Sequence, residues 1–570
     1  MKKWSFSFSL VVTIMMLVIS ASVSLSKTVE LSKGKSDKQF PVSVVLNSDG
    51  NTEQNLFIWY DESNNGTLFA QKMNSDGSIE WGNSGKILMS NFGYMSDFPI
   101  VHPDNTGGAV IIFHRNSIYT DEIFAVKLDS YGNIENRTVS LSAGLPGSNY
   151  SPATAVTEHG FIVVTWEHFY DGHFDIYAQA IDYNLNKLWN DEQPAKVCLY
   201  DNDQRKPTLT SDGQGGVFIA WLDNRNSFEN SLNYSLDVFA SRLDHDGTPY
   251  QNGHKGSLIL RNNFTSPLGS SGVHNLRKEL FYNHNLILSD NNSFMIAAEI
   301  YDTSGNYIKV LKVNKDMQII AAKSLTENLN AGDPRIISDG NSGMYLVWKD
   351  YSNNSNLILG TAFDKDLNDK FSGNSLLISC EITKGNSERI LPDIRIKNSM
   401  IVNNGDLFVS WMNTDNNRLF ISKLDLTDES DLCNNTVEIL SSIDEGEYTS
   451  ITIQDDKLVI VYKHFNNIFA HIRELNGKTL FERTDEFNLS NYPNPFNPTT
   501  RINFFIPKEG FVSLRVFDIT GKEVRKLVNE YRTNGEHNVT FNAENLSSGA
   551  YFYRLDAGGI VTTRRMTILK

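Results

Sequence analysis

The sequence GGVFIAWLDNRN, residues 215–226, decides the fold, because variants of it recur along nearly the whole chain. After Gly215 and Gly216, the run VFIAW is apolar and too short for an ordinary helix, which predicts a strand buried on both faces. The polar DNRN that follows predicts a turn. Residues 237–244 predict the next strand, which ends at the turn Asp246-Gly247.

Seven further copies carry the same pattern. They are LFIWYDE from residue 56, VIIFHRN from 110, VVTWEHF from 163, MIAAEIY from 295, YLVWKDY from 345, FVSWMNT from 408 and VIVYKHF from 459. The equivalent anchor positions are Trp59, Phe113, Trp166, Trp221, Ala298, Trp348, Trp411 and Tyr462. Their successive spacings are 54, 53, 55, 77, 50, 63 and 51 residues. A period near fifty is typical of a propeller or a solenoid.

Each period also holds a strand before the anchor strand, as in residues 206–211 and 333–338, and an outer strand, as in residues 86–90 and 196–200. Four antiparallel strands per period make one propeller blade. The sequence therefore predicts an all-β protein whose main part is an eight-bladed β-propeller. Seven blades are the alternative, because the fifth copy has Ala298 in place of an aromatic anchor and follows the longest spacing.

The N-terminal residues predict both an export signal and a closing strand. Residues 1–26 carry Lys2 and Lys3 and then an apolar run ending in small residues, which favours a cleaved signal peptide over a membrane span. Residues 28–32 resemble the fourth strand of a blade. We expect them to complete the last blade, because ring closure removes exposed sheet edges. Residues 479–483 compete for that place.

Strand alternation assigns the connections to two faces of the ring. Connections between strands one and two, and between three and four, share a first face that carries tight turns such as residues 211–216. The other connections share a second face. Both large insertions, residues 227–236 and 261–282, leave from this second face at one sector. Long loops on a rigid scaffold commonly carry binding sites, so ligand binding is expected there.

The amino-acid composition limits which kinds of molecule the chain can bind. The net charge of −16 makes the chain a poor electrostatic partner for nucleic acid or anionic lipid. Contact with a membrane is therefore expected only through export or surface attachment. The three cysteines, Cys198, Cys380 and Cys433, are odd in number and widely spaced, which excludes a disulfide framework and a zinc knuckle. This pattern favours buried free thiols over a single bridge.

Beyond residue 481 the pattern changes. YPNPFNPTT, residues 492–500, contains three prolines and excludes both a helix and a central strand. Short alternating strands follow at residues 501–506, 512–518, 523–528, 537–541, 550–555 and 561–569, separated by turns that contain glycine. This spacing predicts a small Ig-like β-sandwich.

These residues resemble the type A C-terminal sorting domain of the type IX secretion system. YPNPFNPTT, FDITGKEV at residues 517–524 and SSGAYFYRL at residues 547–555 occur in the family's order, with Phe517 where relatives often have tyrosine. The positions that carry the resemblance are Tyr492, Pro493, Asn494, Pro495, Phe496, Asn497, Pro498, Asp518, Gly521, Gly535, Gly549, Tyr551 and Lys570.

The resemblance implies the export pathway of the protein and its final location. The chain would cross the inner membrane by its signal peptide and the outer membrane by the type IX machinery, which is the implied partner. The sorting domain would then be cleaved, and the remainder released or attached to surface lipopolysaccharide, in a member of the Bacteroidota or their neighbours. The expected limits are a signal peptide at 1–26, a propeller at 27–482, a linker at 483–491 and the sorting domain at 492–570.

Several aromatic and histidine residues are candidate ligand contacts. The anchor tryptophans end buried strands, so packing between blades is a better interpretation than sugar stacking. Loop aromatics suit stacking better, namely Tyr170, Phe228, Tyr234 and Tyr351. His168, His173, Asp171 and Asp175 could hold a metal ion, but their spacing matches no zinc pattern, and a solvated turn is favoured. No cofactor is expected, with calcium as the one exception considered.

Catalytic signatures are absent from the sequence. Asp61, Asp223 and Asp350 follow anchor strands, where capping a turn is preferred to calcium binding or catalysis. NSDGSIEW, residues 74–81, approaches the Asp box of sialidases, but its aspartate and glycine are adjacent. We find no Gly-x-Ser-x-Gly elbow, no His-Glu-x-x-His helix and no phosphate loop.

These observations favour a secreted or surface-attached, non-catalytic binding module for a glycan, a peptide or another extracellular partner. The alternative is a secreted hydrolase, glycosidase-like, whose acids converge from several blades at the central opening. Three or more carboxylates or an arginine cluster there would favour the hydrolase, whereas asparagine, serine and apolar residues would favour binding. A third possibility is a structural surface protein in which the propeller is a spacer.

Overall fold

The computed structural model describes residues 26–569 except 35, 48–52, 92, 96–97, 117–120, 190–192, 227–235, 251–252, 262–283, 291, 303–304, 326–330, 352–356, 372–375, 380–399, 414–417, 425–435, 441–448, 465, 476–488, 507–508, 519–521, 534 and 558–559. The chain divides into two compact units, Met1–Gly477 and Lys478–Lys570. The predicted signal peptide lies outside the described residues. No helix among the described residues is long and apolar enough to cross a membrane.

The described part of the first unit contains eight four-stranded antiparallel sheets. From the inner strand outward, the first four are β2 (Lys38–Leu46), β3 (Gln54–Asp61), β4 (Thr67–Asn74), β5 (Lys86–Ser90); β6 (Ile100–Pro103), β7 (Ala109–Asn116), β8 (Asp121–Leu128), β9 (Ile134–Ser140); β10 (Ser148–Val156), β11 (Ile162–Tyr170), β12 (His173–Ile181), β13 (Ala195–Cys198); and β14 (Gln204–Ser211), β15 (Val217–Asp223), β16 (Asp237–Leu243), β17 (Ser257–Leu260). A short 3-10 helix, η2 (Gly253–Lys255), precedes β17.

The second four sheets have the same order. They are β18 (His284–Asp290), β19 (Ser293–Asp302), β20 (Gly305–Asn314), β21 (Ile319–Leu325); β22 (Ala331–Ser338), β23 (Met344–Asp350), β24 (Leu357–Phe363), β25 (Leu376–Leu377); β26 (Met400–Asn403), β27 (Asp406–Asn413), β28 (Arg418–Leu424), β29 (Thr436–Leu440); and β30 (Thr449–Gln454), β31 (Lys457–His464), β32 (Asn467–Glu474), β1 (Ser26–Glu30). The copy that contains Ala298 thus forms a complete sheet.

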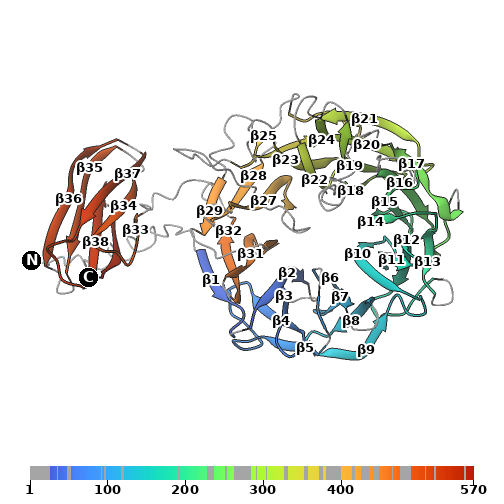
Figure 1. Cartoon of the computed structure of the whole chain (residues 1–570), viewed down its shortest axis with the longest axis horizontal. Coiled ribbons are helices and arrows are strands. Elements are labelled where there is room, and N and C mark those ends of the chain that lie inside the picture. Colours follow the sequence, from blue (N-terminus) through green and yellow to red (C-terminus); the bar gives the residue numbers. More distant parts are fainter. Residues whose placement is uncertain are drawn as a thin grey trace, which may run out of the picture. The chain divides into compact units, whose positions relative to one another are not determined.

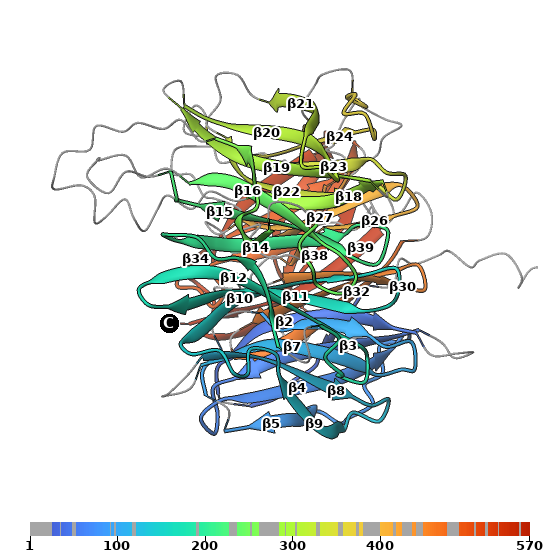
Figure 2. The same ribbon diagram turned by 90° about the vertical axis from the view of Figure 1, so that its right-hand side faces the viewer.

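The eight sheets stand around a ring, with β2, β6, β10, β14, β18 and β22 toward its centre and β5, β9, β17 and β21 on the rim (Figure 1). Figure 2 shows the same strands after a quarter turn. Inner strands of most adjacent sheets contact one another, and β2 also contacts β30, so the first and last sheets meet. These repeated sheets confirm the all-β class and are consistent with a β-propeller.

The N-terminal strand closes the ring. β1 lies antiparallel to β32, with Val29 opposite Ala470, and forms the outer strand of the last sheet. Leu31, which follows β1, is fully buried among residues of the first and last sheets, including Phe57 and Val459. This confirms the predicted closure. The competing segment, residues 479–483, lies outside the described residues.

The anchor tryptophans pack between neighbouring sheets, as the sequence predicts. Trp166 lies in one core cluster with Val110 and Ile112 of the preceding sheet, and Trp221 in another with Val163 of the sheet before it. The same holds for Trp59, Trp348 and Trp411. All five side chains are buried. They stabilise the ring by apolar burial, so they are not available for stacking on a sugar.

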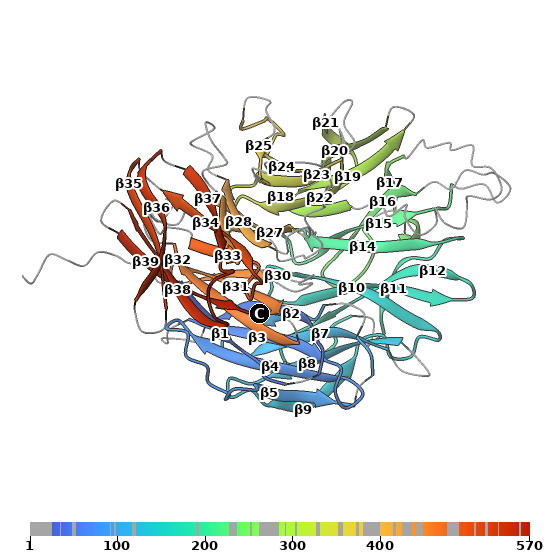
Figure 3. The same ribbon diagram turned by 60° about the vertical axis from the view of Figure 1, so that its left-hand side comes forward.

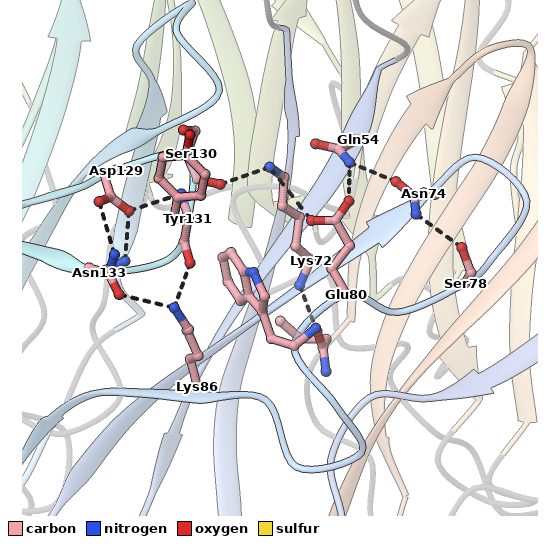
Figure 4. A network of polar contacts seen from close by, with 12 residues as sticks. Gln54, Lys72, Asn74, Ser78, Glu80, Lys86, Asp129, Ser130, Tyr131 and Asn133 are labelled. Atoms are coloured by element: carbon pink, nitrogen blue, oxygen red, sulfur yellow. Dashed lines mark hydrogen bonds and ion pairs between the residues drawn. The ribbon is translucent and has the colours of Figure 1, made fainter.

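Polar contacts at the turns of the first face also join neighbouring sheets. Lys72 Nζ donates to the carbonyl oxygen of Ser130 at 3.1 Å, and Lys86 Nζ donates to that of Tyr131 at 2.5 Å (Figure 4). Within the second sheet's turn, the Asp129 carboxylate accepts the backbone N–H of Asn133 at 2.8 Å. In the third sheet, Trp189 Nε1 donates to the next turn at the carbonyl oxygen of His245. The first and third sheets are thereby tied to the turns of the sheets that follow them.

The second unit is a two-sheet sandwich. One sheet has the order β33 (Leu489–Tyr492), β34 (Thr499–Ile506), β37 (Gly535–Asn542), and the other has the order β36 (Glu523–Arg532), β35 (Gly510–Phe517), β38 (Gly549–Ala557), β39 (Ile560–Ile568) (Figure 3). Alternate residues of both sheets, including Ile502, Leu514 and Leu555, fill one core. The sandwich predicted from the spacing is therefore present.

Candidate functional site

Both predicted insertions leave the sheet β14–β17 at the same end of its strands. Asp223 at the end of β15 pairs with Asp237 at the start of β16, and the neighbouring Val238 pairs with Leu260 at the end of β17. Residues 227–235 and 262–282 themselves lie outside the described residues. Gln204 at the start of β14 also pairs with Asp223, so the inner strand begins at this end.

Four inner strands, each in a different sheet, bend near their first residues. In each strand the bend lies at the residue before a proline. Phe40, Ser151, Lys206 and Asp333 have left-handed φ values of 55°, 52°, 52° and 52°. Each strand also has a register shift there. A side chain before proline normally avoids this conformation, so surrounding contacts must hold it.

Carboxylates from the preceding sheet hold two of these bends. Glu167 Oε1 accepts the backbone N–H of Lys206 at 2.7 Å, and Glu299 Oε2 accepts that of Asp333 at 3.2 Å. Glu167 and Glu299 each follow an anchor position, Trp166 and Ala298. A buried acceptor at this place satisfies a backbone donor that the bulge removes from the strand ladder.

Glu167 also pairs with Arg205. Its Oε2 lies 2.8 Å from Arg205 Nε, and the glutamate side chain is 1% exposed, whereas the arginine side chain is 40% exposed. Burial raises the pKa of Glu167, opposed first by the charge of Arg205. The Arg205 guanidinium also lies 3.7 Å from the ring centre of Phe174, which packs against Phe169 at 4.8 Å. The cation is therefore fixed between a carboxylate and an aromatic ring.

Asp333 forms a second pair of contacts two sheets further round the ring. Its Oδ1 lies 3.1 Å from an Arg335 guanidinium nitrogen, and its Oδ2 lies 3.2 Å from Lys349 Nζ. The side chain of Asp333 is 10% exposed and that of Arg335 is 23% exposed. We call the seven residues of these two groups the inner charge cluster: Glu167, Arg205, Lys206, Glu299, Asp333, Arg335 and Lys349.

Lys206 connects the two halves of the inner charge cluster. Burial lowers the pKa of Lys206 to about 8. Glu167 and Asp333 raise this pKa, whereas Arg205 and Arg335 lower it. Both halves of the cluster therefore contribute to the electrostatic environment of one ammonium group.

Beside Lys206 lies a buried histidine with one unpartnered ring nitrogen. His284 is 6% exposed, and its Nε2 donates to the carbonyl oxygen of Ala220 at 3.2 Å. Burial lowers the pKa of His284 to about 4, with a smaller contribution from Lys206, so Nδ1 carries a lone pair at neutral pH. Neither His284 Nδ1 nor Thr208 Oγ1, on the residue that pairs with Ala220, has a hydrogen-bond partner.

Three of the four candidate metal ligands are neighbours across β11 and β12, because His168 pairs with Asp175 and His173 with Tyr170. His168 Nδ1 donates to the Asn149 side-chain oxygen at 2.9 Å, and burial lowers the pKa of His168 to about 4. His173 Nε2 lies 3.7 Å from Asp175 Oδ2, and burial raises the pKa of Asp175 to about 6. Asp171 occupies the turn with a φ of 54°. Within the described ranges, no three His, Cys, Asp or Glu side chains are arranged to hold a metal ion.

The structure describes some of the candidate loop aromatic residues and the candidate turn cap Asp61. Tyr170 is 52% exposed, and Tyr351 is part-exposed near Gly332, whereas Phe228 and Tyr234 lie outside the described residues. Asp61 accepts the backbone N–H of Ser63 at 2.8 Å, which confirms it as a turn cap.

Asp223 has a similar role, because its Oδ1 accepts the backbone N–H of Arg225 at 2.9 Å. Asp350 is buried. Cys198 is a buried free thiol, and burial raises its pKa to about 12. Cys380 and Cys433 lie outside the described residues.

Sequence reasoning missed the inner charge cluster. A usable signal was present, because a proline recurs as Pro41, Pro152, Pro207 and Pro334 near the start of the inner strand. A glutamate directly after the anchor position, in two copies, was the second part of this signal. The sequence does not say which of these prolines and glutamates lie near one another, because that depends on the curvature of the ring.

In the second unit, the proline-rich segment binds the last strand. Phe496 is 2% exposed, its backbone N–H donates to Thr567 at 3.1 Å, and its carbonyl oxygen accepts from Leu569 at 2.9 Å. The Asn494 side chain accepts the Thr567 N–H at 2.8 Å. The Asn494-Pro495 and Asn497-Pro498 peptide bonds are cis. This segment therefore joins the start of the domain to its end.

Other residues that carry the resemblance to the sorting domain lie in turns or at the ends of strands, or are buried. Asp518 Oδ1 accepts the N–H of Lys522 at 3.1 Å in the turn after β35. Tyr551 is buried, and its hydroxyl donates to the carbonyl oxygen of Ser547 at 3.1 Å. Tyr492 ends β33, while Gly535 and Gly549 begin β37 and β38. Gly521 and Lys570 lie outside the described residues.

Residues 490–569 match the secretion system C-terminal sorting domain. This sorting domain implies interaction with the type IX secretion machinery and places the protein outside the cell or at its outer surface. The match covers the second unit and says nothing about the first, because the same domain is attached to cargoes of many kinds. No curated protein matches the sequence.

Several solved structures are similar in fold at low sequence identity. A polysaccharide lyase, Uly1, is 8% identical with a TM-score of 0.38, over 74% of this chain and 88% of that one. Prolyl oligopeptidase B from Galerina marginata is 10% identical with a TM-score of 0.38, over 76% and 56%. A thermostable family-43 glycoside hydrolase is 10% identical with a TM-score of 0.28, over 50% and 94%.

Proposed function

We propose that this chain is a secreted binding module, in which an eight-bladed propeller presents a ligand-binding face and the sorting domain provides export. The N-terminal signal peptide delivers the chain to the periplasm, and the type IX machinery carries it across the outer membrane. The sorting domain is then cleaved, and the propeller is released or held at the surface. The propeller has no catalytic role in this proposal.

The observation that carries the proposal is the shared position of two features. The inner charge cluster lies at the same end of the strands as both insertions. At that end, Gln204, Asp223 and Asp237 are paired across β14, β15 and β16. Charged side chains are costly to bury, so a cluster fixed by buried ion pairs beside long loops favours a role in recognition.

A glycan array with the mature chain tests this proposal, with hydrolysis of the same glycans followed in parallel. Binding without turnover is the expected result. Deletion of residues 227–236 together with 261–282 should abolish binding while the rest of the ring stays folded. If every detected partner still bound after this deletion, the proposed face would be wrong.

A hydrolase is the second candidate, because the inner charge cluster contains three carboxylates, Glu167, Glu299 and Asp333. Each one, however, accepts a backbone N–H or pairs with a cation, so acid or base chemistry at any of them would disrupt a contact that holds the strands. Turnover on the array that is lost in Glu167→Gln or Asp333→Asn, with binding retained, would favour the hydrolase.

A further inference from the structure

We propose that the inner charge cluster binds an acidic polysaccharide, with Arg205 and Arg335 contacting its carboxylate or sulfate groups. This inference rests on the proposed binding function and adds the chemical class of the ligand. It is argued from the layering of charge in the cluster, from two unpartnered polar atoms and from the neighbouring aromatic side chains.

The cluster has its anions inside and its arginines outside. The side chains of Glu167 and Asp333 are 1% and 10% exposed, while those of Arg205 and Arg335 are 40% and 23% exposed. Glu299 and Lys349 are buried as well. Four cationic side chains therefore stand against three carboxylates, and the accessible part of the cluster is the cationic part. In a chain with a net charge of −16, this is a local site for an anion.

The part-exposed guanidinium groups are held in place before any ligand arrives. Arg205 is fixed by Glu167 and by the ring of Phe174, and Arg335 is fixed by Asp333. A planar guanidinium with free N–H groups pairs with carboxylate or sulfate oxygens in a defined geometry. Preorganised donors lose little conformational entropy on binding, which favours affinity.

Two further features favour a polysaccharide over other polyanions. His284 Nδ1 and Thr208 Oγ1 are buried polar atoms without a hydrogen-bond partner, and a hydroxyl group, which both donates and accepts, complements either atom. Phe169 and Tyr170 are 38% and 52% exposed, and Phe169 continues the aromatic contact that holds Arg205. Aromatic faces next to cations suit the apolar face and the acidic group of a charged sugar.

Binding of the full mature chain to polygalacturonate, dextran sulfate and neutral dextran tests the inference. Both acidic polymers should bind and dextran should not, and affinity should fall as salt rises. Arg335→Gln should weaken binding to the acidic polymers by about tenfold, because one charge-assisted contact is lost. It leaves Asp333 paired with Lys349, so the fold is kept. Lys323→Gln, which removes an equal charge from the outer strand β21, is the matched control and should not change affinity.

The ligand offers a test that needs no variant. Methyl-esterified polygalacturonate keeps the hydroxyls but loses the charge, and it should not bind. Binding of the ester or of dextran equal to that of the acid would overturn the inference, as would equal affinity for single-stranded DNA or no effect of Arg335→Gln. A neutral glycan that binds on the array would then leave the binding function standing, whereas an array without any ligand would overturn that function itself.

Discussion

The Nζ of Lys457 lies 2.7 Å from the carbonyl oxygen of Ser75, and this contact joins the last sheet of the ring to the first. It repeats the contact between Lys72 and Ser130, in which a lysine of one sheet donates to the turn of the next. Beside it, Ser43 and Ser450 hydroxyls lie 3.1 Å apart on the inner strands β2 and β30. The junction between the chain ends therefore uses a lysine-to-turn contact like that between the first and second sheets.

Ring closure by the N-terminal strand can be tested at Leu31. Leu31→Ala should lower the free energy of unfolding by about 3 kcal/mol, because a fully buried leucine is truncated where the first and last sheets meet. Urea unfolding followed by tryptophan fluorescence reports this, since the sorting domain has no tryptophan. Ile320→Ala, at a side chain that is 54% exposed, is the control and should cost little. Equal effects of the two changes would contradict the closure.

Close packing at the turns can be tested with two glycines. Gly247 has a φ of 83°, and an added Cβ would lie 2.7 Å from the ring of Trp189. Gly160 has a φ of 76° in a similar turn and nothing within 4 Å. Both alanine variants incur a left-handed penalty of about 1 kcal/mol. Gly247→Ala should lower the free energy of unfolding by roughly 1–3 kcal/mol more, through overpacking. Urea unfolding that shows no difference would argue against this contact.

Stability should fall in acid because of buried neutral histidines. The pKa of His284 is lowered to about 4 in the folded chain and is near 6.5 when exposed, so between pH 6.5 and 4 the unfolded chain binds more protons. The loss for this group reaches roughly 3 kcal/mol near pH 4. His168 and His471, also lowered to about 4, act in the same direction. Asp175, raised to about 6, opposes them.

The measurement is urea unfolding at pH 7 and pH 4.5 for wild type and His284→Gln. The variant should lose less stability between the two pH values, because its side chain stays neutral in both states. His245→Gln, at an exposed position, should keep the wild-type difference. A pH dependence of His284→Gln identical to that of wild type would show that His284 is not buried as a neutral group.

The proline-rich segment of the sorting domain should be essential for export. Phe496→Ala removes a side chain that is 2% exposed from the core of a small domain, a change that costs roughly 3–5 kcal/mol. We expect the domain to unfold and the protein to accumulate in the periplasm of its own host. Phe511→Ala, at a side chain that is 49% exposed, should be exported normally. Immunoblots of periplasm and culture medium decide, and normal export of Phe496→Ala would disprove this role.

Much of the fold could be predicted because it is encoded locally. Apolar runs such as VFIAW ending at Trp221 specify buried strands, and turn residues such as Asp246-Gly247 specify where strands reverse. Both depend on neighbours within a few residues, and both recur in every copy. The packing of Trp166 and Trp221 between sheets follows, because an aromatic side chain on a strand buried on both faces must meet an adjacent sheet.

The inner charge cluster could not be predicted in this way. Glu167, Lys206 and Asp333 lie in three different sheets, and no local pattern says which inner strands bring their charges within reach of one another. The surroundings of the metal candidates could not be predicted for a related reason. His168 Nδ1 donates to the Asn149 side chain, which comes from another strand, and the spacing of His168 and Asp175 in the sequence gives no sign of that contact.

The sequence by itself thus determined the strands, the repeat, the closing strand and the sorting domain, because periodic burial and turn chemistry act over short distances. Only the tertiary structure decided where charge gathers. Lys206 is influenced by Glu167 and Asp333 at once because ring curvature brings strands of different sheets together, and burial strengthens their electrostatic interaction. The exposed arginines above buried carboxylates are a consequence of that geometry.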